Sequence, residues 1–199
     1  MAYYHDLITE KSFAALLEFR RKYRFILIGG WAVYLYAEAL KSRDIDFICD
    51  YEELEKLKKN YALVKNDRLK KYEIHMGEFD VDIYIPFFSD LGLPVEDLSL
   101  LTRSINGFTV LKPEALLILK QKAHFDRSHS VKGEKDKLDI IALIPNVDFK
   151  KYGALLKKYN VEYYKKSLAV LLKETREAPE LDLNAHAFAQ WKKKVLRNL

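Results

Sequence analysis

Two aspartates, Asp44 and Asp46, stand one residue apart in the apolar segment "DIDFIC", which favours a β-strand. Alternate residues of a strand project from the same face, so the two carboxylates should lie side by side, with Ile45 and Phe47 packed behind them. Carboxylates that close repel each other unless water or a cation separates them. Oxygen-only ligands suit Mg²⁺ or Mn²⁺, so we expect this pair to bind such an ion.

A third carboxylate comes from the later segment "EFDVDIYIP", which alternates polar and apolar residues as a strand does. Asp82 lies on its polar face and would join the first pair if the two strands were neighbours. Asp80 shares that face, so the alternation leaves both residues open. Three aspartates from adjacent strands can hold two metal ions, which stabilise the attacking and the leaving oxygen in phosphoryl or nucleotidyl transfer.

A glycine pair, Gly29-Gly30, separates the short apolar segment "RFILI" from the helix-forming segment "WAVYLYAEAL". Glycines between a strand and a helix let backbone N–H groups approach an anion, and a helix N-terminus favours negative charge. We therefore expect the phosphates of a nucleotide at this pair. A Gly-Gly turn or an Asp-x-Asp strand alone is more often structural, but thirteen residues between Gly30 and Asp44 make the combination more specific.

This combination resembles the polymerase-β-type nucleotidyltransferase superfamily. In that pattern a Gly-Gly or Gly-Ser pair precedes an apolar-flanked Asp-x-Asp, and a third carboxylate follows on a later strand. The matching residues are Gly29, Gly30, Asp44, Asp46 and Asp82, with Asp80 as the alternative to the last. The resemblance implies an α+β fold with a mixed sheet. It also implies that Asp44 and Asp46 bridge two Mg²⁺ or Mn²⁺ ions. Asp82 would bind the ion at the acceptor, and Ser42 would join the glycines in holding phosphates.

A second segment, "LKPEALLILKQKAHFDRSHSVKGEKDKLDIIAL", resembles the C-terminal motif of the abortive-infection-type branch, which includes bacterial toxin enzymes. Lys120-x-x-Ala123, Arg127, Lys135-Asp136 and Asp139-Ile140 match that motif in order. Lys120, His124 and Arg127 recur at helical spacing and so share one helix face. There, with Asp136 to orient the cations, they would hold phosphate oxygens or a base edge. Ordinary surface ion pairs are the alternative. The branch commonly has an Arg where this chain has Leu40, and Lys41 or Arg43 could replace it.

The hydrophobic periodicities divide the chain into two domains. Residues 1–111 read as a mixed α/β domain, and residues 112–199 as a helical domain that carries a basic tail. The resemblance implies that the first is the nucleotidyltransferase domain and that the second completes the nucleotide site. The net charge is +5, but residues 150–199 contain twelve Lys and Arg against five Asp and Glu, a local charge of +7. Such a tail favours a polyanionic partner, although solvated helix faces have the same composition.

Several features point to a cytoplasmic protein. No apolar run approaches the length that spans a bilayer. The segment "MAYYHDLITEKSF" lacks the basic start and apolar core of a secretory signal. Cys49 is the only cysteine, so an intrachain disulfide is impossible, and its apolar surroundings favour buried filler over a nucleophile.

The expected activity is transfer of a nucleoside monophosphate from a triphosphate such as ATP to a hydroxyl, with release of pyrophosphate. The expected acceptor is RNA, such as a tRNA end, or a protein, and the toxin-like branch implies a possible antitoxin-like partner. Two alternatives remain: an antibiotic-type enzyme that modifies a small molecule, and a non-catalytic regulatory module that binds nucleotides.

Overall fold

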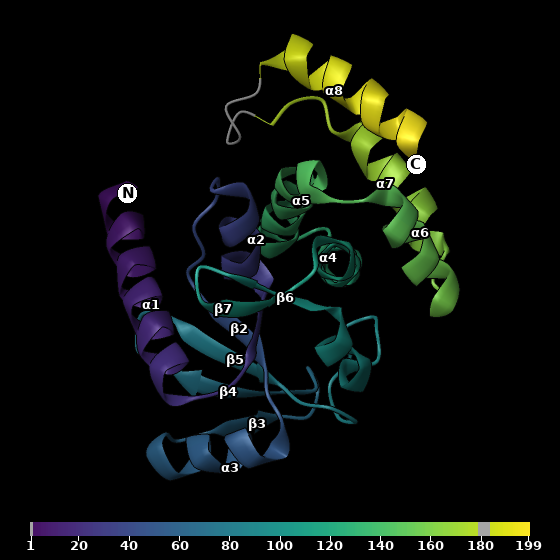
Figure 1. The fold of residues 1–199 in the computed structure, drawn as a ribbon. Helices are drawn as coiled ribbons and strands as arrows, with labels where there is room; N and C mark the ends of the chain where they lie inside the picture. The colour runs from purple at the N-terminus through teal and green to yellow at the C-terminus, as the bar shows by residue number, and fades with distance from the viewer. Residues whose placement is uncertain (1, 179–183) are drawn as a thin grey trace. The chain divides into compact units, whose positions relative to one another are not determined.

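The computed structural model describes residues 2–178 and 184–199. The chain divides into two compact units, unit 1 (Met1–Lys112) and unit 2 (Pro113–Leu199). Unit 1 combines helices with a mixed sheet, and unit 2 is helical in its described part (Figure 1). The predicted α+β fold, with a mixed sheet followed by helices, is confirmed.

The elements of unit 1 follow the predicted order closely. They are α1 (Ala2–Lys22), β1 (Ile26–Ile28), α2 (Gly29–Ala37), β2 (Ile45–Ile48), α3 (Tyr51–Asn60), β3 (Val64–Asn66), β4 (Lys71–His75), β5 (Asp80–Tyr84), the 3₁₀ helix η1 (Val95–Leu101), β6 (Thr102–Ile105) and β7 (Phe108–Leu111). Asn106 and Gly107 connect β6 to β7 with φ values of 49° and 77°. Two positive φ values are what a tight hairpin of this kind requires.

The seven strands form one sheet in the order β3-β4-β5-β2-β1-β7-β6. β2 runs parallel to β5 and antiparallel to β1, and β1 runs parallel to β7. The pairs β3–β4, β4–β5 and β6–β7 are antiparallel. This topology places the two aspartate-bearing segments on adjacent strands.

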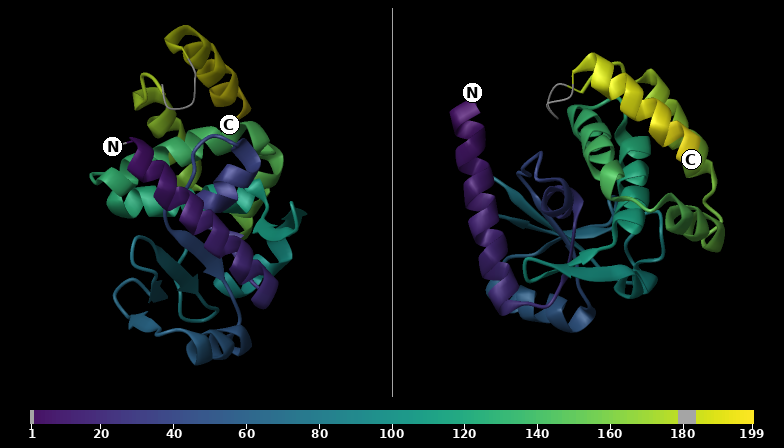
Figure 2. Two further views of the ribbon diagram at one scale, coloured as in Figure 1. Left: turned by 90° about the vertical axis from the view of Figure 1, so that its left-hand side faces the viewer. Right: turned by 45° about the horizontal axis from the view of Figure 1, so that its top comes forward.

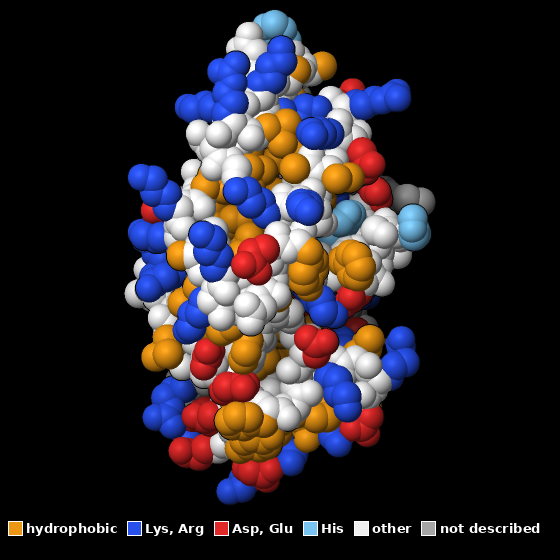
Figure 3. All heavy atoms as spheres, turned by 90° about the vertical axis from the view of Figure 1, so that its right-hand side faces the viewer, with side chains coloured by type: hydrophobic (Ala, Val, Ile, Leu, Met, Phe, Trp, Pro, Cys, Tyr) orange, Lys and Arg blue, Asp and Glu red, His pale blue; other side chains and the backbone are white. Residues whose placement is uncertain are grey.

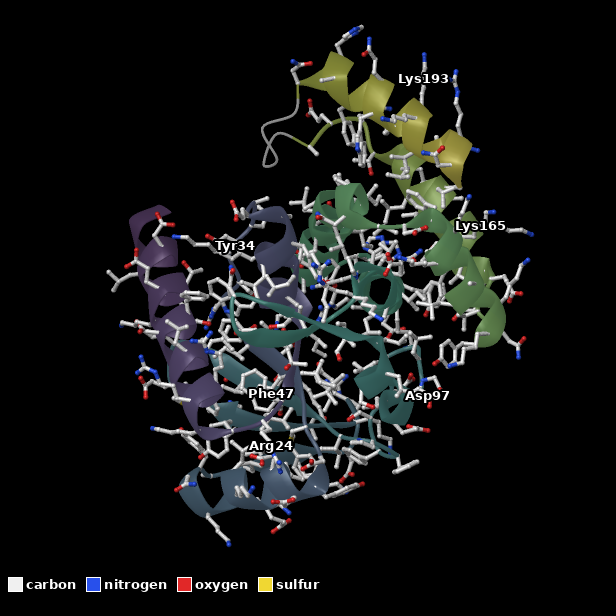
Figure 4. The ribbon with its side chains drawn as sticks, viewed as in Figure 1. Arg24, Tyr34, Phe47, Asp97, Lys165 and Lys193 are labelled. Carbon is white, nitrogen blue, oxygen red and sulfur yellow. The ribbon has the colours of Figure 1, made fainter. Side chains whose placement is uncertain are left out.

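One face of the central strands is a packed apolar surface. Ile45, Phe47, Val81 and Ile83 of β2 and β5 are fully buried there. Phe19 of α1 contacts Phe47, with ring centroids 6.0 Å apart. Figure 2 shows α1 running along the sheet, and Figure 4 labels Phe47 on the central strand β2. Because side chains alternate, the residues between these positions project from the opposite face.

The described part of unit 2 consists mainly of helices. They are α4 (Pro113–Arg127), α5 (Val131–Leu143), the 3₁₀ helix η2 (Ile144–Asn146), α6 (Phe149–Lys158), α7 (Tyr163–Glu174) and α8 (Ala185–Asn198). The α5 helix begins at Val131, directly after Ser130, whose side chain caps it by accepting a hydrogen bond from the Gly133 N–H. The predicted last helix began at Leu183, which lies outside the described residues.

Buried hydrogen bonds tie three helices of unit 2 together. Gln121 of α4 donates to the main-chain oxygen of Tyr164 at 2.8 Å, and the hydroxyl of Tyr152 donates to Oε1 of Gln121 at 2.7 Å. All three residues are buried, so these bonds satisfy groups that water does not reach. Across residues 2–178 and 184–199, none of the helices combines the length and apolar character that a membrane crossing requires.

Candidate active site

Unit 1 brings the three predicted aspartates to one region of the sheet. Asp46 of β2 and Asp82 of β5 are direct register partners on neighbouring parallel strands, so their side chains share a face. Asp44 lies one residue before β2, which therefore begins one residue later than the segment "DIDFIC". The face that carries these carboxylates is the one opposite α1.

Gly29 connects β1 to α2 and lies directly against Asp46. Its φ is +66°, in the left-handed region that glycine tolerates best. A Cβ atom on Gly29 would stand 2.1 Å from Oδ2 of Asp46, closer than real atoms approach. The anion nearest to Gly29 is thus a carboxylate of the chain itself, a reason for glycine that the sequence did not reveal. Gly30 is buried in the first turn of α2.

Lys71 and Glu73 of β4 extend this polar face by one strand. Glu73 is the register partner of Asp82, and Lys71 lies two residues earlier on the same side. The Lys71 ammonium is 2.6 Å from Oδ2 of Asp82 and 2.8 Å from Oε1 of Glu73. Sequence reasoning placed a strand here but missed these side chains. The alternation of Lys71, Glu73 and His75 was the available signal.

The surroundings of Asp82 disfavour its charge. Burial raises the pKa of this carboxyl to about 7, and the negative charge of Asp46 acts in the same direction, although Lys71 opposes both. Burial alone would lower the pKa of Lys71, but Asp82 and Glu73 together raise it. The ammonium therefore stays charged and only partly relieves the repulsion between the two aspartates.

Asp80, the alternative third carboxylate, has a different environment. Its side chain is 48% exposed, whereas that of Asp82 is 13% exposed. Asp80 accepts a hydrogen bond from Nδ1 of His75 at 2.8 Å, which raises the pKa of that imidazole. The Asp80 N–H also donates to Oδ1 of Asp44 at 3.3 Å. Proximity to Asp46 and burial support Asp82 as the third carboxylate.

Ser42, a predicted phosphate ligand, lies in the loop before β2. It is buried, and its hydroxyl donates to the main-chain oxygen of Asp44 at 3.1 Å. This bond shapes the turn that delivers Asp44 to the site. Neighbouring Arg43 is exposed, with Nε 3.9 Å from Oδ1 of Asp44.

Unit 2 brings together the predicted residues of α4 and α5. The ammonium of Lys120 lies 2.6 Å from Oδ2 of Asp139 and 3.3 Å from Oδ1 of Asp136. Arg127 donates from Nε and Nη2 to the two oxygens of Asp136, at 2.7 and 3.1 Å. His124 faces the same region, with Nδ1 3.0 Å from the main-chain oxygen of Gly133. These residues form a connected network, which we call the α4–α5 ion cluster.

Burial and charge compete at the centre of this cluster. Burial alone would raise the pKa of Asp136, but Lys120 and Arg127 lower it below its usual value. Asp136 and Asp139 are thus buried carboxylates that depend on adjacent cations. The close approach of α4 to α5 also depends on Gly133, where a Cβ atom would stand 2.1 Å from the main-chain oxygen of Arg127. Sequence reasoning missed this glycine.

Solved structures match the chain over most of its length. No protein-family model matches it, and neither does any curated protein. A crystal structure of JHP933 from Helicobacter pylori is 18% identical, with a TM-score of 0.51, over 97% of this chain and 92% of that one. A crystal structure of ANT(2″)-Ia in complex with adenylyl-2″-tobramycin is 16% identical, with a TM-score of 0.52, over 77% of this chain and 95% of that one. These neighbours are nucleotidyltransferase folds.

The chain has a nucleotidyltransferase fold. The predicted resemblance to the polymerase-β-type superfamily is therefore confirmed at the level of the fold. Within this fold, the carboxylates of β2 and β5 and the glycine at the start of α2 occupy one face of the sheet.

The nucleotidyltransferase fold raises the question of whether Mg²⁺ or Mn²⁺ fits the carboxylates. Within the described part of the chain, no three His, Cys, Asp or Glu side chains are placed to hold a metal ion together. In unit 1, Lys71 contacts Oδ2 of Asp82, and the Asp80 N–H donates to Oδ1 of Asp44. The chemistry nevertheless fits: carboxylate oxygens on one face are hard donors whose repulsion a divalent cation relieves.

A pocket of about 680 Å³ opens elsewhere in unit 1, at the opposite ends of the central strands. Ile26, Ile48 and Cys49 line it, and none of the predicted site residues does. Cys49 is buried, as predicted, and burial together with Asp50 and Glu53 raises the pKa of its thiol to about 12. A thiol with so high a pKa is a poor nucleophile at neutral pH. The environment of Cys49 thus agrees with its predicted role as buried filler.

We predict that Asp82→Asn raises the melting temperature of the metal-free protein at pH 8, because burial and Asp46 disfavour the ionised carboxyl. A carboxyl with a raised folded-state pKa stabilises the fold below its unfolded pKa of about 4, and this contribution is lost as the pH rises through about 7. The difference in melting temperature between Asp82→Asn and wild type should therefore be small at about pH 5 and larger above pH 7. Thermal unfolding across this range measures it.

Asp80→Asn is the matched control, since it removes the same charge from an exposed position on the same strand. It should change the melting temperature little. A lower melting temperature for Asp82→Asn at pH 8 would show that the ion pair with Lys71 outweighs the repulsion from Asp46.

Proposed function

We propose that this protein transfers a nucleoside monophosphate from a nucleoside triphosphate to a hydroxyl of an acceptor, releasing pyrophosphate. One observation carries the proposal: in a nucleotidyltransferase fold, Asp46 and Asp82 are register partners beside the glycine that begins α2. Repulsion between carboxylates that lie this close together is costly in a purely structural role. A module that only binds nucleotides would not need these carboxylates, so the cost of their repulsion would have no functional reason.

Each predicted site residue of unit 1 has a proposed role in this reaction. Asp44, Asp46 and Asp82 would hold two Mg²⁺ or Mn²⁺ ions, which when bound would offset charge on the attacking and leaving oxygens. Asp82 would also bind the ion at the acceptor and help to take the proton of the acceptor hydroxyl. The backbone N–H groups at Gly29 and Gly30 would hold phosphate oxygens, and Ser42 would support them by fixing the loop before Asp44.

The α4–α5 ion cluster would bind the triphosphate. Arg127 is the best placed for direct contact, because its side chain is 43% exposed while that of Lys120 is 9% exposed. Lys120 and Asp136 would hold Arg127 in position, and His124 would contribute a hydrogen bond to phosphate or base. Guanidinium groups bind phosphate oxygens in a fork geometry, which suits this assignment.

An RNA acceptor is the first candidate because of the exposed lysines of unit 2. The pairs are Lys150-Lys151 and Lys157-Lys158 of α6, Lys165-Lys166 of α7 and Lys193-Lys194 of α8, and all of them are exposed. In Figure 4 the side chains of Lys165 and Lys193 extend outward from their helices. Figure 3 shows Lys and Arg side chains spread among hydrophobic ones over one side of the molecule. Such a surface can neutralise the phosphates of a nucleic acid.

A small-molecule acceptor is the second candidate. The neighbour ANT(2″)-Ia was crystallised with adenylyl-2″-tobramycin, an antibiotic that carries an adenylyl group. The fold is therefore compatible with an acceptor of that size. A protein acceptor, including an antitoxin-like partner, is the third class that the experiment below compares.

The decisive experiment incubates the protein and Mg²⁺ with each α-labelled nucleoside triphosphate. Total RNA, a protein fraction and aminoglycosides are offered in turn, and the labelled class identifies the acceptor. Asp46→Asn and Asp82→Asn should abolish labelling, because each removes a carboxylate from the shared face. Asp67→Asn, an exposed aspartate paired with Lys65, is the control and should leave labelling unchanged.

Labelling of no acceptor with any triphosphate would favour the regulatory module instead. Full activity of Asp82→Asn together with loss of activity in Asp80→Asn would move the third carboxylate to Asp80.

We predict that Arg127→Met weakens triphosphate binding by about 1.5–3 kcal/mol, the usual value of a charge-assisted hydrogen bond. Lys122→Met is the control, because Lys122 lies on the same helix but pairs with Asp126. Calorimetric titration of each triphosphate into both variants measures the effect. Equal affinities in Arg127→Met and wild type would reduce the α4–α5 ion cluster to a structural network.

We predict that reversing Lys157-Lys158 to Glu reduces the salt dependence of RNA binding and slows RNA labelling, while triphosphate affinity stays unchanged. Each phosphate contact on a single strand contributes roughly −0.7 to the log–log slope of affinity against salt, so each lost contact flattens the slope by that amount. Lys58-Lys59 is a matched pair at the end of α3, and its reversal carries the same cost at a helix C-terminus. Identical RNA binding in both reversals would return the small-molecule acceptor to first place.

A further inference from the structure

Lys71 occupies an unusual position for a lysine. Its side chain is only 11% exposed, and its ammonium contacts the carboxylates of Asp82 and Glu73 at 2.6 and 2.8 Å. Both acids are themselves nearly buried, at 13% and 16% exposure. A nearly buried ammonium needs such partners, because it loses its hydration on leaving water.

The position of Lys71 matters because the ammonium takes up an oxygen that a metal ion would need. Oδ2 of Asp82 is the atom it holds, and Asp82 is the register partner of Asp46 on the neighbouring strand. A divalent ion and the ammonium cannot share that oxygen without strong repulsion between like charges. A divalent ion that binds Oδ2 would therefore have to displace the ammonium.

Glu73 is a second carboxylate partner for the Lys71 ammonium. In the order β4-β5-β2, Glu73 lies one strand farther from Asp46 than Asp82 does. Its carboxylate is also held by the Asn66 side chain, whose Nδ2 lies 3.3 Å from Oε2. Lys71 can therefore release Asp82 and keep an ion pair on the same face of the sheet.

We propose that Lys71 is a built-in counter-ion of Asp82, and that a divalent cation binds this carboxylate only by displacing the ammonium onto Glu73. The inference rests on the proposed function, because it concerns the same carboxylates. It predicts that the metal-free site is held together by Lys71. It also predicts that the ion at Asp82 binds more weakly than it would without this competitor.

Mn²⁺ binding to the full chain, followed by the electron paramagnetic resonance of free Mn²⁺, tests the exchange without any nucleotide. Lys71→Met should bind Mn²⁺ roughly tenfold more tightly than wild type, since one charge-assisted contact no longer has to be broken. Its metal-free melting temperature should fall at pH 8, and Mn²⁺ should restore it. Lys71→Arg keeps the charge and should show no gain in affinity. Lys65→Met, on neighbouring β3, removes a lysine that pairs with Asp67 and should behave as wild type.

Glu73→Gln supplies a second, independent variant. It should weaken Mn²⁺ binding in the wild-type background, because the displaced ammonium loses its acceptor, and it should have a smaller effect in the Lys71→Met background. Equal or weaker Mn²⁺ binding by a folded Lys71→Met variant overturns the exchange, while loss of binding in Asp82→Asn would still support the metal site. Absence of Mn²⁺ binding in wild type and all variants overturns the exchange together with the metal site.

Discussion

Repulsion between Asp46 and Asp82 is the constraint on which the candidate site depends. The parallel register of β2 and β5 fixes these residues opposite each other. The buried apolar face behind them disfavours a register shift that would exchange the two faces of either strand. A shift of one residue would bury both carboxylates against α1. The fold therefore has to accommodate the charge where it stands. It does so with a glycine that makes room for Asp46 and a lysine that neutralises part of the charge on Asp82.

The α4–α5 ion cluster also contains buried carboxylates, but more cations surround them than surround the aspartates of unit 1. In unit 2 the buried carboxylates of Asp136 and Asp139 have Lys120, Arg127 and Lys135 around them, and the pKa of Asp136 is lowered. In unit 1 the aspartates outweigh the nearby ammonium, and the pKa of Asp82 is raised. A region with surplus negative charge attracts cations, whereas a cluster of three cations and two carboxylates with an exposed guanidinium can exchange carboxylate contacts for phosphate. The two units thus differ in the sign of the ligand that they favour.

Local patterns were sufficient to predict much of the fold. Alternation identified β5, and Pro113 marked the start of α4. The parts that could not be predicted depend on contacts between distant segments. Lys71 matters only because β4 pairs with β5 in one register, which no local pattern specifies. The start of α5 follows from the Ser130 cap, and Gly133 is required only because α4 ends against it. The resemblance already favoured Asp82 over Asp80, and the burial of Asp82 and its register with Asp46 support that preference.

Stability and catalysis make opposite demands on Lys71 under the proposed function. The ammonium stabilises the metal-free fold because it offsets carboxylates that the sheet register forces together. The same contact must break before Asp82 can serve a divalent ion, so a stronger ion pair would stabilise the protein and weaken its metal binding. Glu73 reduces this conflict, since it accepts the ammonium one strand away and leaves no buried charge without a partner. We therefore interpret Glu73 as part of the exchange. It acts when Lys71 has left Asp82, because it then pairs with the displaced ammonium.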